Sequence, residues 1–291
     1  MLCGCIDIGT NTTRVLVAQA GRGRLEEVLQ RRAFTHLGRG LGPDDEIPAD
    51  RIAATAEVVA AQHALAREAG ASAIRTVATA VIRRAANARE FCAAVRRHCG
   101  VEVAVLDGEE EARLAFLGAT RTFGHTLAGR VAVVDVGGGS TEIAVGTSGA
   151  GVEWSASLPF GSGVLADRFL RGDPPHPDEL AAARRHAERA LDGLEPPRVD
   201  RALAVGGSAA SLRRLVGPVL DRAALDRALD VLAQDSAARV AARYRLEAQR
   251  VRLLPAGLLA LGAVAARIDE PLQIGNGGLR EGVLLDLAGS A

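Results

Sequence analysis

Short apolar runs alternate with amphipathic stretches along the whole chain. The pattern predicts strands at 2–9, 14–20 and 24–31, with a tight link over 20–23 that makes the last two a hairpin. Helix, strand, helix, strand and helix follow, beginning with an amphipathic helix over 50–69. The second of these helices opens at Asn87, which forms a predicted capping box with Glu90. Three meandering strands followed by this alternation predict a mixed sheet with helices on both faces, the ribonuclease-H-like arrangement of the α/β class.

The last helix of this series opens at Asp107. Asp107 and Glu110 form a predicted capping box, and Glu109 stands four residues before Arg113 and can pair with it. Glu111 instead shares the inward face of the helix with apolar and small residues, namely Leu114, Ala115 and Gly118. It is either a carboxylate at the edge of the core or one that looks into a cleft. In a cleft, partial desolvation raises its proton affinity, which suits a general base that activates water.

The order of elements then begins again near residue 130. Strands are predicted at 130–136, 141–147 and 152–158, followed by a helix over 178–192. A later strand, 201–205, runs through Gly206 and Gly207 into a helix that begins at Ser208. A strand that meets a helix N-terminus through glycines can bind an anion at Gly206, Gly207 and Ser208, although a plain strand-to-helix turn has the same sequence. Helices over about 221–232 and 235–243, an apolar helix over 255–267, a strand over 271–275 and a helix over 279–288 complete the prediction.

The second set of strands contains the stretch Asp-Val-Gly-Gly-Gly-Ser-Thr-Glu, from Asp135 to Glu142. An acid at the end of an apolar run, followed by glycines and another apolar run, predicts a strand, a tight turn and a returning strand. Backbone N–H groups and hydroxyls of the turn can point at one anion, and they come from Gly137, Gly138, Gly139, Ser140 and Thr141. Asp135 can hold a hydrated Mg²⁺ against that anion. The alternative is a glycine-rich hairpin with an acid nearby and no ligand.

The same pattern occurs at the start of the chain, where Asp7 to Val17 lies over Asp135 to Val145 position for position. The acid, the first glycine, the hydroxyl-rich turn of Thr10, Asn11 and Thr12, and the apolar return all coincide. Such a repeat predicts two copies of one supersecondary unit. We therefore expect two ribonuclease-H-like domains, 1–126 and 127–291, whose acid-tipped hairpins hold a phosphate chain and a metal in the cleft between them. The last helix, 279–291, can pack back on the first domain.

Composition narrows the function classes. The chain has 291 residues, 48% of them hydrophobic, and its 35 basic and 35 acidic residues balance. Nothing in this balance indicates attraction to nucleic acid or to a membrane. All basic residues are Arg, which excludes a P-loop lysine. The four cysteines have no metal-ligand spacing and are expected to be reduced in a cytoplasmic protein. We expect no signal peptide and no apolar run long enough to span a bilayer.

Several stretches together resemble the exopolyphosphatase and guanosine pentaphosphate phosphohydrolase family, within the superfamily of acetate and sugar kinases, Hsp70 and actin. Besides the two hairpins they are 78–87 (ATAVIRRAAN), 108–116 (GEEEARLAF), 254–257 (LPAG) and 278–282 (GLREG). The resemblance covers essentially the whole chain in order. It implies two actin-like domains with the active site in the cleft between them.

The resemblance also implies roles for individual residues. Glu111, directly before Ala-Arg, becomes the base that positions the attacking water, and Arg83 becomes a phosphate ligand. Asp135 and Glu142 become ligands of a divalent metal, Mg²⁺ or Mn²⁺, and Asp7 is the corresponding acid of the first hairpin. The turns around Asn11 and over Gly137–Ser140 become the two phosphate cradles. Phosphoryl transfer needs mainly positioning and charge neutralisation, which these groups supply.

The expected activity is release of terminal orthophosphate from inorganic polyphosphate, with hydrolysis of pppGpp to ppGpp as a further activity. The resemblance implies short-chain polyphosphate and a homodimer. The chain departs from the family's pattern at Gly275-Asn276-Gly277-Gly278, where an acid is more usual. Two alternatives remain at this point: an ATP-dependent small-molecule kinase of the same superfamily, and a slow or non-catalytic sensor of polyphosphate or (p)ppGpp.

Overall fold

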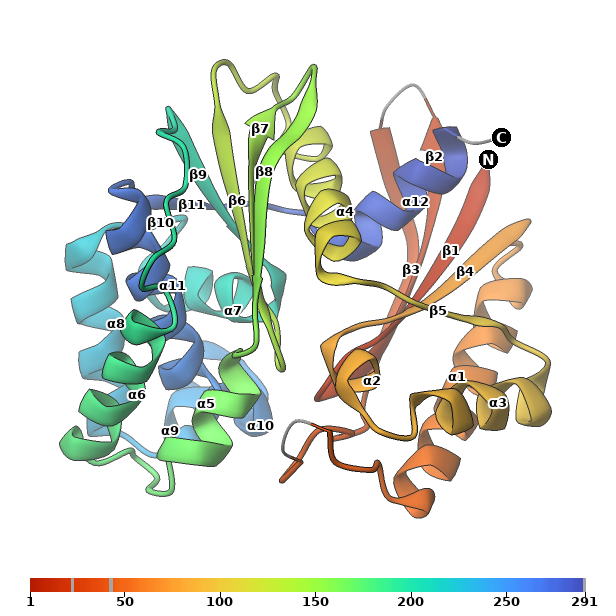
Figure 1. Cartoon of the computed structure of the whole chain (residues 1–291), viewed down its shortest axis with the longest axis horizontal. Helices are drawn as coiled ribbons and strands as arrows, with labels where there is room; N and C mark the ends of the chain where they lie inside the picture. The colour runs from red at the N-terminus through yellow and green to blue at the C-terminus, as the bar shows by residue number, and fades with distance from the viewer. Residues whose placement is uncertain (22–23, 42–43, 290–291) are drawn as a thin grey trace. The chain divides into compact units, whose positions relative to one another are not determined.

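The computed structural model describes residues 1–21, 24–41 and 44–289, and the chain divides into two compact units. Unit 1 comprises Met1–Gly124 and Gly277–Ala291, and unit 2 comprises His125–Asn276. The first boundary lies at 124/125 instead of the predicted 126/127. The last helix, α12 (Leu279–Gly289), groups with unit 1, in line with the expectation that it can pack back on the first domain. It does so because it packs on α4 (Gly108–Arg121) and on β1 (Leu2–Ile8), which belong to unit 1 (Figure 1).

Unit 1 is built on a five-stranded sheet in the order β3-β2-β1-β4-β5. Strands β1, β2 and β3 are antiparallel neighbours, and β4 and β5 continue parallel to β1. The strands beyond β1 are β2 (Thr12–Gly21), β3 (Arg24–Phe34), β4 (Ala73–Ala78) and β5 (Val103–Val105). The predicted hairpin is therefore present, although its turn residues 22–23 lie outside the described residues.

Helices cover both faces of this sheet. Side chains of successive strand residues point to opposite faces, so β1 contributes to a core on each side. On one face, Ile6 and Ile8 join a core with α1 (Ala49–Glu68) and α3 (Ala88–Cys99). On the other, Cys3 and Cys5 join a smaller core with α4 and α12. Asp7 follows Cys5 by two residues, so its side chain is on the face that α4 and α12 cover.

The sheet of unit 2 repeats the strand arrangement of unit 1. Its six-stranded sheet has the order β10-β11-β9-β6-β7-β8, and the antiparallel and parallel pairings of β8-β7-β6-β9-β11 match those of β3-β2-β1-β4-β5. The strands are β6 (Val131–Val136), β7 (Thr141–Thr147), β8 (Gly151–Leu158), β9 (Arg201–Val205), β10 (Val219–Leu220) and β11 (Leu272–Ile274). The repeat predicted from the two hairpins thus extends to the whole strand order.

The helices of unit 2 pack around one large core with the central helix α11 (Leu254–Ile268). They are α5 (Ser162–Phe169), α6 (Pro177–Arg189), α7 (Gly206–Val216), α8 (Arg222–Gln234), α9 (Ala237–Tyr244) and α10 (Ala248–Val251). The hydrophobic pattern missed α5, α10, β10 and, in unit 1, α2 (Ala80–Arg84), because one or two turns of helix or a two-residue strand carry too little periodicity.

The segment Ala248–Ile268 corrects the expectation that no apolar run could span a bilayer. It has 21 residues and a mean hydropathy of 1.6, so it is long and apolar enough by those two measures. The turn contributed by α10 supplies the length that the predicted helix over 255–267 lacked. Within the described part of the chain, 67% of the 18-residue apolar window in this segment is buried. The helix α11 packs on α5, α6, α7 and α8. This burial is typical of a core helix.

Two predicted side-chain interactions are also replaced by others. Asn87 does not cap α3; its side-chain amide instead exchanges two hydrogen bonds with the backbone of Ile47, at 2.9 and 3.0 Å. Asp107 does cap α4, accepting from the Glu110 N–H at 2.8 Å. The Glu110 carboxylate, however, pairs with Arg113, which was predicted to pair with Glu109.

Candidate active site

The two acid-tipped hairpins have the same turn geometry. The Gly9 N–H donates to Thr12 O at 3.0 Å in unit 1, and the Gly137 N–H donates to Ser140 O at 3.0 Å in unit 2. A Cβ at either glycine would lie 3.2 Å from the same carbonyl oxygen. The sequence repeat is therefore a repeat of backbone structure.

In unit 2, N–H groups and a hydroxyl of α5 donate hydrogen bonds to the carbonyl groups of the glycine turn. Gly137 O accepts from the N–H and the hydroxyl of Ser162 at 2.9 and 3.0 Å, and Gly138 O accepts from the N–H groups of Gly163 and Val164 at 2.9 and 3.1 Å. A Cβ at Gly161 would lie only 2.6 Å from Gly137 O, so this close approach requires glycine. The helix that the hydrophobic pattern missed thus fixes the orientation of the turn.

The N–H groups of Gly138, Gly139 and Ser140 donate to no other described residue. Successive backbone N–H groups with no acceptor form a concave site for an anion. Ser140 is 3% exposed, so the end of this site is shielded from water. Unit 1 has a corresponding arrangement, because Thr10 O and Asn11 O accept from the backbone of residues 35–38 and the Nδ2 of Asn11 is buried without a partner among the described atoms.

Asp135 and Glu142 are direct cross-strand neighbours on β6 and β7. Such partners point to the same face of the sheet with Cβ atoms about 4.5–5.5 Å apart. Glu142 is 2% exposed and accepts from the Ser157 hydroxyl at 2.8 Å. Like charges placed directly opposite each other are unfavourable, so this pair fits a divalent cation, which takes carboxylate oxygens and keeps several waters.

The equivalent pair in unit 1 carries opposite charges. Asp7 is the cross-strand partner of Arg14, at the position where unit 2 has Glu142. Burial raises the pKa of Asp7, and the positive charges of Arg14 and Arg280 partly offset this. The described residues contain no group of three or more His, Cys, Asp and Glu side chains that could hold a metal. The unit 2 pair thus joins two carboxylates, whereas Asp7 in unit 1 is balanced by arginine.

The third glycine turn lies at the start of α7, and it contacts Asp135. Gly206 has a positive φ of 82°, which favours glycine, and a Cβ there would overlap the Asp135 carboxylate. The first-turn N–H groups of α7, from Gly206, Gly207 and Ser208, therefore begin beside the carboxylate pair of Asp135 and Glu142. The Ser208 side chain is 1% exposed and packs against Gly257, so this residue contributes its N–H to the turn rather than its hydroxyl.

Glu111 is buried, at 7% exposed, in the first turn of α4. Its Oε2 accepts from Arg83 Nη1 at 2.8 Å, and the same nitrogen donates to Leu106 O at 2.7 Å. Arg83 comes from α2, the short helix that follows β4. Glu111, the predicted base, and Arg83, the predicted phosphate ligand, are thus brought together in unit 1, with the guanidinium fixing the orientation of the carboxylate.

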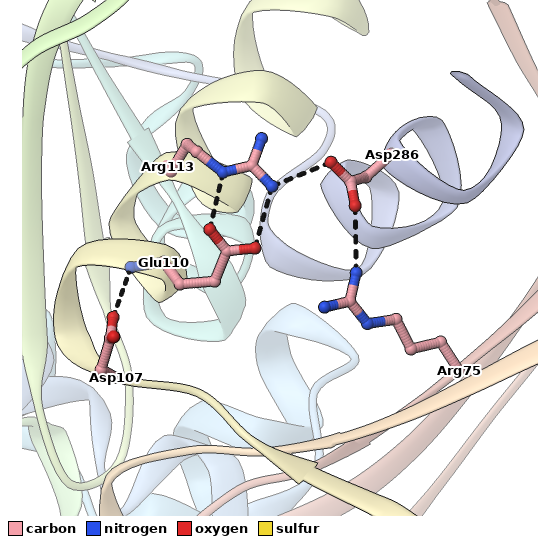
Figure 2. Close-up of polar contacts among 5 residues, drawn as sticks. All are labelled: Arg75, Asp107, Glu110, Arg113 and Asp286. Atoms are coloured by element: carbon pink, nitrogen blue, oxygen red, sulfur yellow. Dashed lines mark hydrogen bonds and ion pairs between the residues drawn. The ribbon is translucent and has the colours of Figure 1, made fainter. Parts of the chain in front are cut away.

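A network of four charged residues fixes the helix that carries Glu111 (Figure 2). Arg113 binds Glu110 through two hydrogen bonds of 2.7 and 2.9 Å and also binds Asp286 of α12, which in turn binds Arg75 of β4. The carboxylates raise the pKa of Arg113. Asp286 is 173 residues from Arg113 along the chain, so no local sequence pattern could have predicted this pairing.

Comparison with known proteins identifies the family. The model of the Ppx/GppA phosphatase family matches residues 16–291. The chain belongs to the Ppx/GppA phosphatase family. It is 32% identical to "Exopolyphosphatase 1" of Mycobacterium tuberculosis, over 98% of this chain and 88% of that protein. It is 30% identical to the crystal structure of the Aquifex aeolicus Ppx/GppA family member, with a TM-score of 0.82 over 100% of this chain and 98% of that one.

The Ppx/GppA membership confirms the predicted family, fold class and enzyme class: an actin-like α/β fold of two domains and a hydrolase of phosphoanhydride bonds. An exopolyphosphatase from Cytophaga hutchinsonii, 19% identical, has the same fold, with a TM-score of 0.88 over 100% of this chain and 99% of that one. The roles assigned to individual site residues, the metal and the homodimer stay predictions.

Proposed function

We propose that this Ppx/GppA phosphatase releases orthophosphate from the end of inorganic polyphosphate in a reaction that depends on Mg²⁺ or Mn²⁺. The observation that carries the proposal is the glycine turn of unit 2, where three N–H groups without an acceptor among the described residues adjoin the paired carboxylates Asp135 and Glu142. Such a site suits a substrate that is a chain of phosphates accompanied by divalent cations.

The proposed mechanism assigns a role to the site residues of each unit. The N–H groups of Gly138 to Ser140 and the start of α7 bind non-bridging oxygens of the terminal phosphate. Glu111 accepts a proton from the attacking water, and Arg83 keeps its carboxylate oriented towards that water. A divalent cation bound by Asp135 and Glu142 would neutralise charge on the phosphoanhydride oxygens. The turn at Thr10–Thr12 with Asn11 binds a further phosphate of the chain.

The proposal is tested by measuring orthophosphate release, with and without Mg²⁺, from polyphosphates of graded length, pppGpp and ATP. We expect Mg²⁺-dependent release from polyphosphate. Activity on pppGpp belongs to the proposal as a second substrate, since it also ends in a phosphoanhydride. ATP consumption that requires an added acceptor would show a kinase instead. Tight binding of polyphosphate without any release would show a sensor.

The Asp135→Asn variant is expected to weaken Mn²⁺ binding by at least ten-fold, because one of two charged metal ligands becomes neutral. Asp221→Asn, on the exposed cap of α8, removes the same charge elsewhere in unit 2 and is expected to leave binding unchanged. Mn²⁺ titration followed by electron paramagnetic resonance measures the affinity without turnover. Equal affinity in wild type and Asp135→Asn would show that the metal is not held by this pair.

A further inference from the structure

A surface groove of about 570 Å³ lies within unit 2. Its floor is α11, and its walls are α6 and α8, which both pack on α11 (Figure 1). None of its described lining residues is one to which the proposed function assigns phosphate, water or a metal. The volume lies within the range of about 300–1,000 Å³ that is usual for binding sites. The proposed function therefore leaves this groove unexplained.

The apolar part of the groove follows one face of two helices. On α8, Leu225 and Leu229 are half-buried and four residues apart. On α11, Gly262 and Ala266 have the same spacing. Rows of this spacing are the ridges that interdigitate in the commonest mode of helix packing. Along α11 the lining covers residues 258–269, a length of about 16 Å at the helical rise per residue. The groove thus has the surface and the length to receive a helix of about three turns.

Small side chains form the floor of the groove. Gly262 and Ala263 are half-buried and Ala266 is exposed, although α11 is the central core helix of unit 2. The distance between the axes of two packed helices depends on the side chains at their contact, so small residues permit a close approach. A helix has to cover its apolar stripe against another element. An external helix can do this for α11 at these positions.

One end of the groove is acidic. The register of β10 and β11 pairs Leu220 with Leu272, so the start of α8 lies beside the end of α11. Asp226, Asp269 and Glu270 line the groove towards this end. Their carboxylates form no hydrogen bond or ion pair with the residues that the structure describes. The C-terminus of α11 adds the negative end of the helix dipole, so this end of the groove favours positive charge.

The charge of the whole lining has the same sign. Five acidic side chains line the groove against two arginines, Arg184 and Arg222, which leaves a net charge of −3. Charged groups across an interface are arranged so that their potentials are complementary, and like charges placed together exclude wrong partners. The groove therefore selects a basic occupant over an acidic one.

We infer that the groove formed by α6, α8 and α11 is the docking site for an amphipathic helix of a partner protein. The apolar residues of this helix pack between the rows of α8 and α11, as in other complexes in which a helix binds a hydrophobic groove. Its basic residues lie at one end and meet Asp226, Asp269 and Glu270. The inference goes beyond the proposed function, and its test uses no turnover, so either can fail without the other.

The probe is a synthetic helical peptide of about 14 residues, with Leu and Ala on one face and Arg and Lys at its C-terminal end, where they also stabilise the helix. Fluorescence anisotropy of the labelled peptide measures its affinity. We expect wild type to bind it at least about ten-fold more tightly than a peptide with Glu in place of Arg and Lys, because like charges across an interface are unfavourable. Hydrogen exchange should show protection of α8 and α11 by the basic peptide.

Ala266→Arg tests the floor of the groove, because it places a long cation at an exposed position of α11. We expect it to weaken binding of the basic peptide by about ten-fold or more, through lost apolar contact and like-charge repulsion. Ala242→Arg adds the same side chain at an exposed position of α9 that does not line the groove. Its affinity should stay within about two-fold of wild type, as for surface changes away from a contact.

Asp226→Asn tests the acidic end of the groove. It should weaken binding about three-fold and make the affinity less sensitive to salt, because one attractive charge is lost. Asp230→Asn makes the same change one turn later on α8, at an exposed position outside the groove, and should do neither. If Ala266→Arg does not fold, this pair of variants gives the decision.

Three results would overturn the inference. The first is equal affinity of the basic peptide for wild type and a folded Ala266→Arg, and the second is tighter binding of the acidic peptide. The third is absence of saturable peptide binding. In that case, a wild-type dimer that Ala266→Arg dissociates in sedimentation would show that the occupant is a second copy of this chain. Saturable binding of dodecylamine at the groove would instead show a small cationic amphiphile.

Discussion

Glu111→Gln is expected to lower kcat for polyphosphate hydrolysis by about 10³-fold, within the range of roughly 10²–10⁴ that general-base catalysis contributes. The substitution removes the proton acceptor but keeps an oxygen that can accept from Arg83 Nη1, now 2.8 Å from the carboxylate. The fold should therefore survive, and KM should change little. Stopped assays of orthophosphate release at saturating substrate, with a thermal melt of each protein, measure both effects.

Glu109→Gln is the matched control, because it makes the same chemical change in the same turn of α4 at an exposed position. We expect its kcat to stay within two-fold of wild type. A Glu111→Gln variant that is folded and retains full activity would contradict the role assigned to Glu111 while leaving the family membership intact.

Gly282→Ala is expected to destabilise unit 1 by about 3 kcal/mol or more, because overpacking a close contact costs roughly 1–3 kcal/mol and here the obstacle is backbone. A Cβ at this position would overlap the carbonyl oxygen of Leu114 and approach its Cα to 3.1 Å. The helices α4 and α12 would have to separate, which would shift Glu111. Chemical denaturation followed by circular dichroism measures the loss, and activity should fall with it.

Gly289→Ala provides the comparison on the same helix, since a Cβ there would meet no atom within 4 Å. The free energy of unfolding of this variant should lie within about 0.5 kcal/mol of wild type. Equal stability of the two variants would show that the close contact between α4 and α12 is not required.

The sequence was sufficient for the succession of strands and helices and for the fold class because two features are local: the period of apolar residues and the acid-glycine hairpin. Since the hairpin occurs twice, one supersecondary unit predicted the topology of both units. The sequence was also sufficient to single out Glu111 as a carboxylate on the inward face of its helix, and the structure shows that this residue is buried. The ion pair with Arg83, 28 residues away, was not visible in that pattern.

What the sequence could not predict depends on contacts between distant residues. The α5 turn that binds the carbonyls of Gly137 and Gly138 comes from a segment of eight residues, too short for a clear period. The contrast between Arg14 and Glu142 was readable in the aligned repeats, since both stand seven residues after the acid. Its consequence for the charge of each pair became clear only from the strand register, which places Arg14 and Glu142 directly opposite the aspartates of their hairpins.

The measurement that tests the central claim most directly is hydrolysis of polyphosphate in water enriched in oxygen-18. If water attacks the terminal phosphorus, each released orthophosphate carries one labelled oxygen from solvent, and the shortened chain carries none from that step. The account predicts this labelling in wild type and its loss with turnover in Glu111→Gln. Label found in the shortened chain, or phosphate transferred to an acceptor without solvent oxygen, would contradict it.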